Sequence, residues 1–334
     1  MEAAEKVLRR LEAAGGSARY GNLTTNRSEQ RALAELVRSG VVLKFAFGCY
    51  SLPTAQQPLS ILQVTKGKLT CISAVDFAGL RTLTEPKQVH VALPRNRGLE
   101  LPPEIARHTV IHRESVFWMN AINGASHLID GSFTAPQGPK MFSPMHTPPS
   151  NGPTHTPPAS VPLAPWPAIF ARVAVCRPLC AAVVAIDSGL NKGLINKDEV
   201  QRLLDPNIHK DALKAVDLAS PTSQSVLESV SRLQLVTKGF RVEPQKFIET
   251  VGYIDLLVED WIAIELDGFA YHGDRSQFRN DRYRDRMLRK LGYEVLRYTY
   301  EEVINTPEVI TRDVRFLLQK RHQNGGTVFS PSAR

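Results

Sequence analysis

Cysteine is scarce in this 334-residue sequence, whose four thiols are Cys49, Cys71, Cys176 and Cys180. So few and scattered cysteines provide no disulfide framework, and we expect a protein of the reducing cytoplasm. No apolar run reaches the roughly 18 residues of a membrane-spanning helix. The first residues, MEAAEKVLRRLEAAGG, form a charged amphipathic pattern without an apolar h-region, so neither secretion nor membrane insertion is expected.

Acidic residues are outnumbered, with 33 Asp and Glu against 41 Lys and Arg, which gives a net charge of +8. A basic balance of this kind favours a polyanionic partner such as nucleic acid. The hydrophobic content of 43% is ordinary for a globular protein, and the length suits two or three domains. We therefore expect an α/β multidomain protein.

Residues 1–55 predict a small helical unit that ends in a β-hairpin. One helix is marked by the Val7 and Leu11 stripe, a second is predicted to begin at a Ser28 cap, and the hairpin spans 41–52 with its turn at Gly48. Helix, short helix, helix and two-stranded wing is the order of a winged helix-turn-helix. Its last helix would offer these side chains to DNA: Arg27, Gln30, Arg31 and Arg38.

The stretches GGSARYGNLTTN and ALAELVRSGVVLKFAFGCYSL within this unit resemble the amino-terminal domain of AbiEi-type antitoxins. The resemblance implies a DNA-binding module of a toxin-antitoxin system, with a cognate toxin as a partner. One feature departs from it, because the wing at residues 44–47 reads KFAF, apolar where basic residues are expected. A winged helix that binds protein is the alternative.

The middle of the chain predicts three further segments. Residues 56–130 fit a small α/β domain, with a helix after a turn in 66–80 and a strand at 88–93, and resemble the region that follows the winged helix in AbiEi-like chains. Residues 131–167 hold 11 of the 23 prolines and predict a flexible linker. A helical connector at 168–221 begins with one apolar helix over 168–187. Its Cys176 and Cys180 lie one turn apart and are either small core residues or a metal or redox pair.

The order of helices and strands can be predicted for residues 222–322, and a disordered tail is predicted at 323–334. Helices are predicted at 224–238, 276–291 and 307–321, and strands at 241–249, 252–258, 261–267 and 293–299. The order is α-β-β-β-α-β-α, with a hairpin of acidic residues in its middle.

Three carboxylates lie in that hairpin: Asp255 within the first strand, and Glu265 and Asp267 at the end of the second. A three-residue turn would place Asp255 opposite Glu265, whereas a two-residue turn would place it opposite Ile264. Like charges directly opposite each other destabilise a hairpin unless a hard cation such as Mg²⁺ lies between them. The sequence thus predicts a metal site, the alternative being solvated strand-end carboxylates with a simple turn at Asp267.

These carboxylates, the Glu265-Leu266-Asp267-Gly268 run, His272 and the segment DRYRDRMLRKLGYEVLRYT together resemble the Vsr-like endonuclease domain of the PD-(D/E)XK superfamily. The resemblance implies that Asp255 is the principal metal ligand and that the main-chain carbonyl of Leu266 is a further one, while Glu265 is the second carboxylate ligand of the predicted metal site. It also implies that His272 matches a downstream histidine and Glu228 the glutamate of the preceding helix.

Asp267 departs from the wider superfamily, which has lysine at this position. The orientation of the attacking water would then fall to His272, Lys246 or Gln245, or to a second metal held by Asp267. His272 could also act as general acid or base.

The predicted helix 276–291 is strongly basic. Its apolar residues can face the core while four arginines face outward and suit phosphate contacts: Arg279, Arg282, Arg286 and Arg289. The alternative is a solvated face with internal Asp-Arg pairs.

The sequence as a whole predicts a Mg²⁺- or Mn²⁺-dependent DNA endonuclease, targeted by the winged helix, with repair or defence proteins as partners. A second hypothesis is a DNA-binding transcriptional regulator or antitoxin with an inactive nuclease fold, and an RNA nuclease also remains open.

Overall fold

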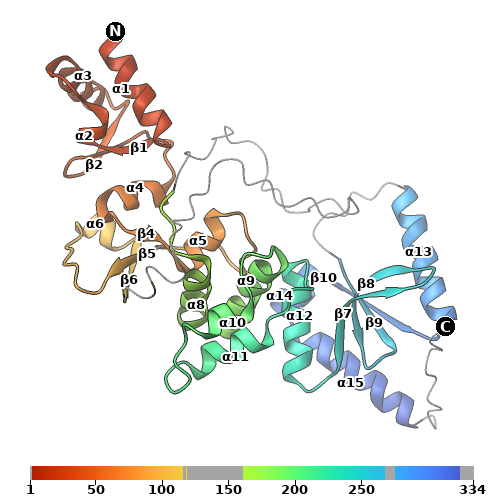
Figure 1. Ribbon diagram of the computed structural model, residues 1–334. Coiled ribbons are helices and arrows are strands. Elements are labelled where there is room, and N and C mark those ends of the chain that lie inside the picture. Colours follow the sequence, from red (N-terminus) through yellow and green to blue (C-terminus); the bar gives the residue numbers. More distant parts are fainter. Residues whose placement is uncertain (1, 116–117, 119–160, 268–274, 324–334) are drawn as a thin grey trace.

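The computed structural model describes residues 2–115, 118, 161–267 and 275–323, without the side chains of 275–281. These residues form a mixed α/β protein in which three sheets have the strand orders β1-β3-β2, β4-β5-β6 and β10-β9-β8-β7 (Figure 1). The predicted linker residues 131–160 and tail residues 324–334 lie outside the described residues. Within the described ranges, no helix is long and apolar enough to cross a membrane.

The first unit comprises α1 (Glu2–Ala13), β1 (Ser17–Arg19), α2 (Tyr20–Leu23), α3 (Arg27–Arg38), β2 (Leu43–Ala46) and β3 (Cys49–Ser51). Helix α3 begins before the predicted Ser28 cap. Asn26 is the actual N-cap, in an extended conformation, and its side chain accepts a hydrogen bond of 3.0 Å from the Glu29 N–H. Ser28 therefore lies in the first turn, and that prediction was wrong by two residues.

The predicted hairpin is confirmed as β2 and β3. Gly48 has a φ of 66° in the connection, a conformation that glycine adopts without steric cost. Phe47 beside it is 95% exposed, so the end of this hairpin presents an aromatic ring to solvent.

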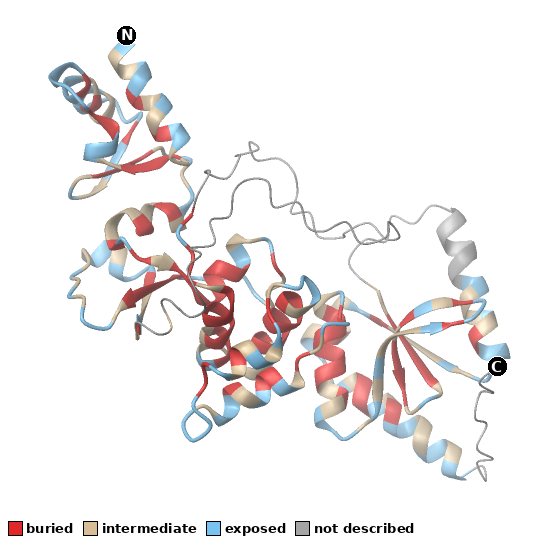
Figure 2. Ribbon diagram, in the orientation of Figure 1, coloured by how far each residue is buried: buried red, intermediate tan, exposed pale blue. Residues whose placement is uncertain are grey.

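The second unit combines a small sheet with a helical layer. It comprises α4 (Gln57–Thr65), β4 (Lys68–Leu69), α5 (Cys71–Phe77), β5 (Val89–Pro94), α6 (Pro103–Ala106), β6 (Thr109–Glu114), α8 (Trp166–Cys176), α9 (Leu179–Asn191), α10 (Lys197–Gln201) and α11 (Lys210–Leu218). One hydrophobic core joins the sheet to the helices and includes Val91, Phe170 and Val183. Figure 2 shows this core as a continuous run of buried elements.

Residues 161–167, the end of the predicted linker, are part of this fold. Leu163 forms a parallel bridge with Leu69, whose N–H donates to the Pro162 carbonyl at 2.7 Å. Helix α8 then begins at Trp166.

The single helix predicted over 168–187 is instead two helices. Helix α8 ends at Cys176 and α9 begins at Leu179, with Arg177 extended at φ −108° and ψ 152°. Pro178 explains the break, because proline lacks an N–H and its ring disfavours the helical conformation of the residue before it.

The third unit comprises α12 (Val226–Thr237), β7 (Val242–Ile248), β8 (Gly252–Val258), β9 (Ile262–Asp267), α13 (Arg275–Lys290), β10 (Glu294–Thr299), α14 (Tyr300–Asn305) and α15 (Glu308–Gln323). Every element predicted between 224 and 321 is present, and α14 is added between the last strand and helix. Thr299 and Glu302 form a capping box that begins α14, a local signal that could have predicted it.

Helices cover both faces of this sheet. Leu256, Ile264 and Tyr298 pack in one apolar cluster with residues of α12, α14 and α15. Ala263 and Leu257 pack in another cluster with Leu288 of α13. The sheet therefore has a helix layer on each side.

Candidate active site

The length of the turn between β8 and β9 decides whether Asp255 lies opposite Glu265. Val258 pairs with Ile262 and Leu256 with Ile264, so the connection has three residues. Glu259 and Asp260 adopt the left-handed region there, with φ of 50° and 65°. Continuing this register by one residue places Asp255 opposite Glu265, as the three-residue alternative predicted.

Two more polar residues lie at the same level of the sheet. On β7 the register pairs Pro244 with Leu256 and Lys246 with Ile254, which leaves Gln245 across from Asp255. On the other side, β9 and β10 pair Glu265 with Arg297. A row of polar residues thus crosses all four strands: Gln245, Asp255, Glu265 and Arg297.

Asp255 is the central carboxylate of this row. Its Oδ2 accepts a hydrogen bond of 2.7 Å from the Leu266 N–H, and its Oδ1 lies 3.5 Å from the Gln245 Nε2. Burial, and then the negative charge of Glu228, raise its pKa from the usual value of 3.8 to about 6. The Asp255 carboxylate is therefore more stable when a proton or a cation neutralises its charge.

Glu265 shares this environment, with only 9% of its surface exposed. Burial and the neighbouring Asp255 raise its pKa to about 7, although Arg284 acts in the opposite direction. The charge of Asp255 therefore raises the proton affinity of Glu265, and perturbed pKa values of this kind are common at functional sites.

Glu228 approaches the row from the first turn of α12. Its Oε2 accepts hydrogen bonds of 2.9 Å from the Gln224 N–H and from the Gln245 Nε2. Burial raises its pKa. Gln245 has a φ of 52°, a strained conformation for a non-glycine residue, and it links Glu228 to Asp255.

Two arginines that the sequence analysis missed neutralise part of this acidity. Arg284 of α13 donates to the Glu265 Oε1 at 2.9 Å and to the Tyr253 carbonyl at 2.6 Å. Arg297 lies 2.8 Å from an Asp285 oxygen and 3.6 Å from an oxygen of Asp267. Asp267, at the position where the superfamily has lysine, is thus next to an arginine.

Helical periodicity could have identified Arg284. It precedes Met287 by three residues and Leu288 by four, so it lies on the helix face whose apolar residues pack on the sheet. Nothing local identifies Arg297, because its approach to Asp267 depends on the parallel pairing of strands that are distant in sequence.

The remaining predicted site residues are Lys246, His272 and Leu266. Lys246 is not beside the carboxylates, since its Nζ binds Glu243 at 2.9 Å on the exposed side of β7. His272 lies outside the described residues. The Leu266 N–H donates to Asp255, and the role of its carbonyl as a metal ligand stays a prediction.

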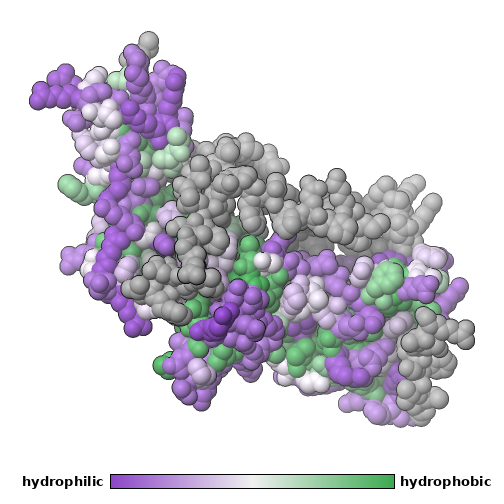
Figure 3. Space-filling model, in the orientation of Figure 1, coloured by the Kyte–Doolittle hydropathy of each residue, from purple (hydrophilic) through white to green (hydrophobic). Residues whose placement is uncertain are grey.

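The predicted DNA-contacting residues are largely at the surface. Arg282, Arg286 and Arg289 of α13 are exposed, while the side chain of Arg279 is outside the described set. On α3 the exposed residues are Arg27, Gln30, Arg31 and Arg38, and Arg38 is ion-paired with Glu35. Figure 3 shows hydrophilic side chains over much of the visible face of this first unit.

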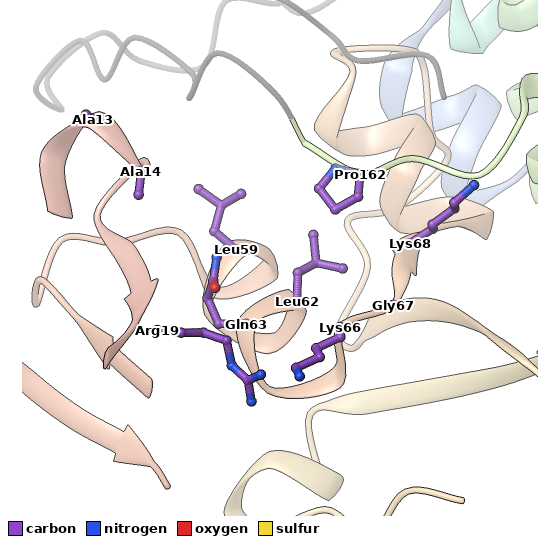
Figure 4. A pocket seen from close by; sticks show the side chains of 10 residues that line it. All are labelled: Ala13, Ala14, Arg19, Leu59, Leu62, Gln63, Lys66, Gly67, Lys68 and Pro162. Carbon is purple, nitrogen blue, oxygen red and sulfur yellow. The ribbon is translucent and has the colours of Figure 1, made fainter. Parts of the chain in front are cut away.

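A separate pocket lies between the first and second units. Ala14, Arg19, Leu59, Lys66 and Pro162 are among its lining residues (Figure 4). None of the hairpin carboxylates lines it, so we place the candidate active site at the polar row of the third unit.

The third unit thus has a four-stranded sheet between helix layers, with two carboxylates opposite each other on its central hairpin. Residues 228–318 match the restriction endonuclease-like family REase_MTES_1575. The match supports such a domain in the carboxy-terminal part of the chain and suggests a nuclease. Families of this kind generally use divalent metals.

Comparison with curated proteins gave no match. Among solved structures, the crystal structure of RV2827C protein from Mycobacterium tuberculosis aligns with a TM-score of 0.37 and 16% sequence identity. The alignment covers 73% of this chain and 84% of that chain.

Proposed function

We propose that this protein is a Mg²⁺- or Mn²⁺-dependent DNA endonuclease that hydrolyses phosphodiester bonds. One observation carries the proposal: the half-buried Asp255 and the buried Glu265 lie opposite each other on β8 and β9, both with raised pKa values, within a segment that matches a restriction endonuclease-like family. Nothing in a purely structural hairpin requires two carboxylates opposite each other and shielded from solvent.

The donor set fits a hard divalent cation. Carboxylate oxygens are the ligands that Mg²⁺ prefers, and Asp255 and Glu265 would hold the ion, with Asp267 at the edge of the site. When bound, such an ion shields a phosphate oxygen and lowers the pKa of a bound water.

The remaining residues would position these ligands. The Leu266 N–H and Gln245 fix the two oxygens of Asp255, and Glu228 in turn holds the Gln245 amide. Arg284 is the cation nearest to Glu265, and we propose that it supplies the positive charge that the superfamily lysine provides elsewhere. His272 keeps its proposed role in proton transfer.

DNA would be bound at two places. The exposed arginines of α13, next to the candidate site in the sequence, would contact phosphates of the cleaved strand. The first unit would act as an AbiEi-like winged helix that presents α3 to the major groove. The apolar end of its hairpin, at Phe47, suits a groove wall or a protein better than a phosphate.

The test is cleavage by the purified full-length protein of supercoiled plasmid, single-stranded DNA and RNA, each with Mg²⁺, Mn²⁺ or EDTA. Asp255→Asn preserves shape and removes the charge, so it should reduce metal-dependent cleavage at least about 100-fold. Asp260→Asn is the matched control, because Asp260 lies on the same hairpin, is exposed and pairs with Arg241. It should cleave like the unaltered protein.

Cleavage that survives in Asp255→Asn would refute the assignment of the site. If no substrate is cut while DNA is still retained in a salt-dependent manner, the regulator or antitoxin hypothesis replaces the nuclease. Cleavage of RNA alone would retain the chemistry and change the substrate.

A further inference from the structure

Four potential metal ligands meet in the second unit, far from the acidic row in sequence. Cys71, His90, His112 and Cys176 each offer one ligand atom, and these four atoms all lie within 4.8 Å of one another. The Nδ1 of His90 is 2.9 Å from the Nε2 of His112, and 4.0 Å from the Sγ of Cys176. Two thiols and two imidazoles therefore converge on one point.

Each ligand comes from a different element. Cys71 begins α5, His90 lies on β5, His112 on the parallel neighbour β6, and Cys176 is the last residue of α8. The first three precede residues 119–160 in the chain and the fourth follows them. No local sequence motif connects these positions, which is why spacing alone did not reveal the cluster.

This arrangement corrects the sequence analysis of Cys176. Its neighbour Cys180 is one turn away in sequence but lies on α9, beyond the break at Pro178. Cys180 packs at the edge of the hydrophobic core and is not among the four clustered residues. Cys176 is thus a candidate ligand, with partners that the tertiary fold supplies.

We propose that these four residues form a structural Zn²⁺ site. Thiolate and imidazole are the ligands that zinc prefers, and a set of two cysteines and two histidines closes its tetrahedral shell. Zinc bonds of about 2.0–2.3 Å hold the ligand atoms of a tetrahedron roughly 3.3–3.8 Å apart. Sub-ångström side-chain shifts would bring the observed atoms to that spacing.

The backbone conformation and burial of the four residues also fit a metal site. Cys71 has a φ of 54°, a left-handed conformation that costs energy for a residue with a side chain. Cys71 and His90 are buried, whereas His112 and Cys176 are half-buried, which leaves a route for an ion. The two imidazole nitrogens face each other at hydrogen-bond distance, and both become acceptors when a cation lies between them.

An independent ion pair holds the same junction in place. Arg172 of α8, one turn before Cys176, donates to Glu114 of β6 at 2.7 Å. Glu114 is two residues beyond His112 on the same strand. The helix and the strand that carry two of the ligands are therefore held together without the metal, so the site is preorganised.

The alternative use of two neighbouring thiols is a disulfide between Cys71 and Cys176. A disulfide would not explain why one nitrogen of each of two imidazoles lies within 4.8 Å of both sulfur atoms. Zinc explains all four side chains, and it would fasten α8 to the β4-β5-β6 sheet across two parts of the chain that are distant in sequence.

The first test is metal analysis of the full-length protein produced in zinc-supplemented medium and dialysed without chelator. We expect roughly one zinc per chain. Cys176→Ser and His112→Asn should each lose at least about 90% of it, and Cys180→Ser, the matched control, should retain it. Asp255→Asn should also retain it, which separates this ion from any metal at the candidate nuclease site.

A second measurement starts from the unaltered protein, so its first result does not depend on the folding of variants. Cobalt added to the unaltered, zinc-depleted protein should give tetrahedral d–d bands and a thiolate-to-cobalt charge-transfer band. EDTA should lower the thermal midpoint of the zinc-loaded protein, and Zn²⁺ but not Mg²⁺ should restore it. The site is supported if Zn²⁺ no longer raises the thermal midpoint of Cys176→Ser but still raises that of Cys180→Ser.

Any one of four outcomes would overturn the proposal. The unaltered protein could bind neither zinc nor cobalt, Cys176→Ser could keep a full equivalent of zinc, or Asp255→Asn could lose the zinc. Recovery of a Cys71–Cys176 disulfide from freshly purified protein kept under reducing conditions would also overturn it, and would assign the two thiols to redox chemistry.

Discussion

Replacement of Asp255 by asparagine should stabilise the metal-free protein at neutral pH while it removes the proposed activity. Asparagine has the same shape as aspartate and keeps an acceptor oxygen for the Leu266 N–H. The change removes one of three negative charges that face each other, those of Asp255, Glu265 and Glu228. Arg284 is the cation that faces this group most closely, through Glu265.

The magnitude follows from the raised pKa of Asp255. In the unfolded chain this carboxyl ionises near its usual value of 3.8, whereas in the folded protein it ionises near 6. Between these values the folded state binds the extra proton, so the free energy of unfolding decreases as pH rises from about 4 to about 6 and stays low above. The shift of about two units corresponds to about 3 kcal/mol. Asparagine should therefore add about 2–3 kcal/mol at pH 8 and almost nothing at pH 4.

Urea denaturation in EDTA, followed by intrinsic tryptophan fluorescence, measures this difference at pH 4 and pH 8, and Trp261 reports on the hairpin itself. Asp260→Asn is the control, because a substitution at this exposed site should alter the free energy of unfolding by less than about 0.5 kcal/mol. The reasoning is refuted if Asp255→Asn destabilises the protein at pH 8, or if its effect is the same at both pH values.

Two further predictions concern packing between the helices of the second unit and the contact with the third. Gly189→Ala should destabilise the folded protein by about 1–3 kcal/mol, because the added Cβ would lie 2.4 Å from the ring of the buried Phe170. Circular dichroism melting curves measure the effect. Gly21→Ala is the control and should leave the curve nearly unchanged, because a Cβ added at Gly21 has nothing within 4 Å. Arg232→Met should cost about 3–5 kcal/mol in urea denaturation, because it leaves the fully buried Asp187 carboxylate, now 2.9 Å from the guanidinium, without its cation. A Met variant as stable as the parent would show that this ion pair does not join α12 to α9.

The restriction endonuclease-like unit was the easiest part to predict, and for a local reason. Its strands are short apolar runs bounded by turn residues, and its helices end at Gly239 and Gly292, both with φ near +90°. These signals depend only on residues near one another in the chain. The helix predicted over 168–187 was wrong because the apolar pattern continues through Pro178 although the backbone cannot.

The acidic site was only partly predictable. Asp255 and Glu265 are conspicuous as carboxylates in apolar strands, but whether they face each other depended on a turn of two or three residues. The structure also adds Arg284 to the site and directs Lys246 away from it. A strand places alternate residues on opposite faces, so the exact backbone path decides which charges meet.

The sequence by itself therefore determined most elements of the third unit, the basic charge and the type of chemistry that its hairpin carboxylates suggest. Only the tertiary structure decided the row of Gln245, Asp255, Glu265 and Arg297, and the meeting of Cys71, His90, His112 and Cys176. The physical reason is common to both cases. Periodicity and propensity report on interactions between residues close in the chain, whereas a binding site needs side chains from several elements, and their distances are set when apolar surfaces pack.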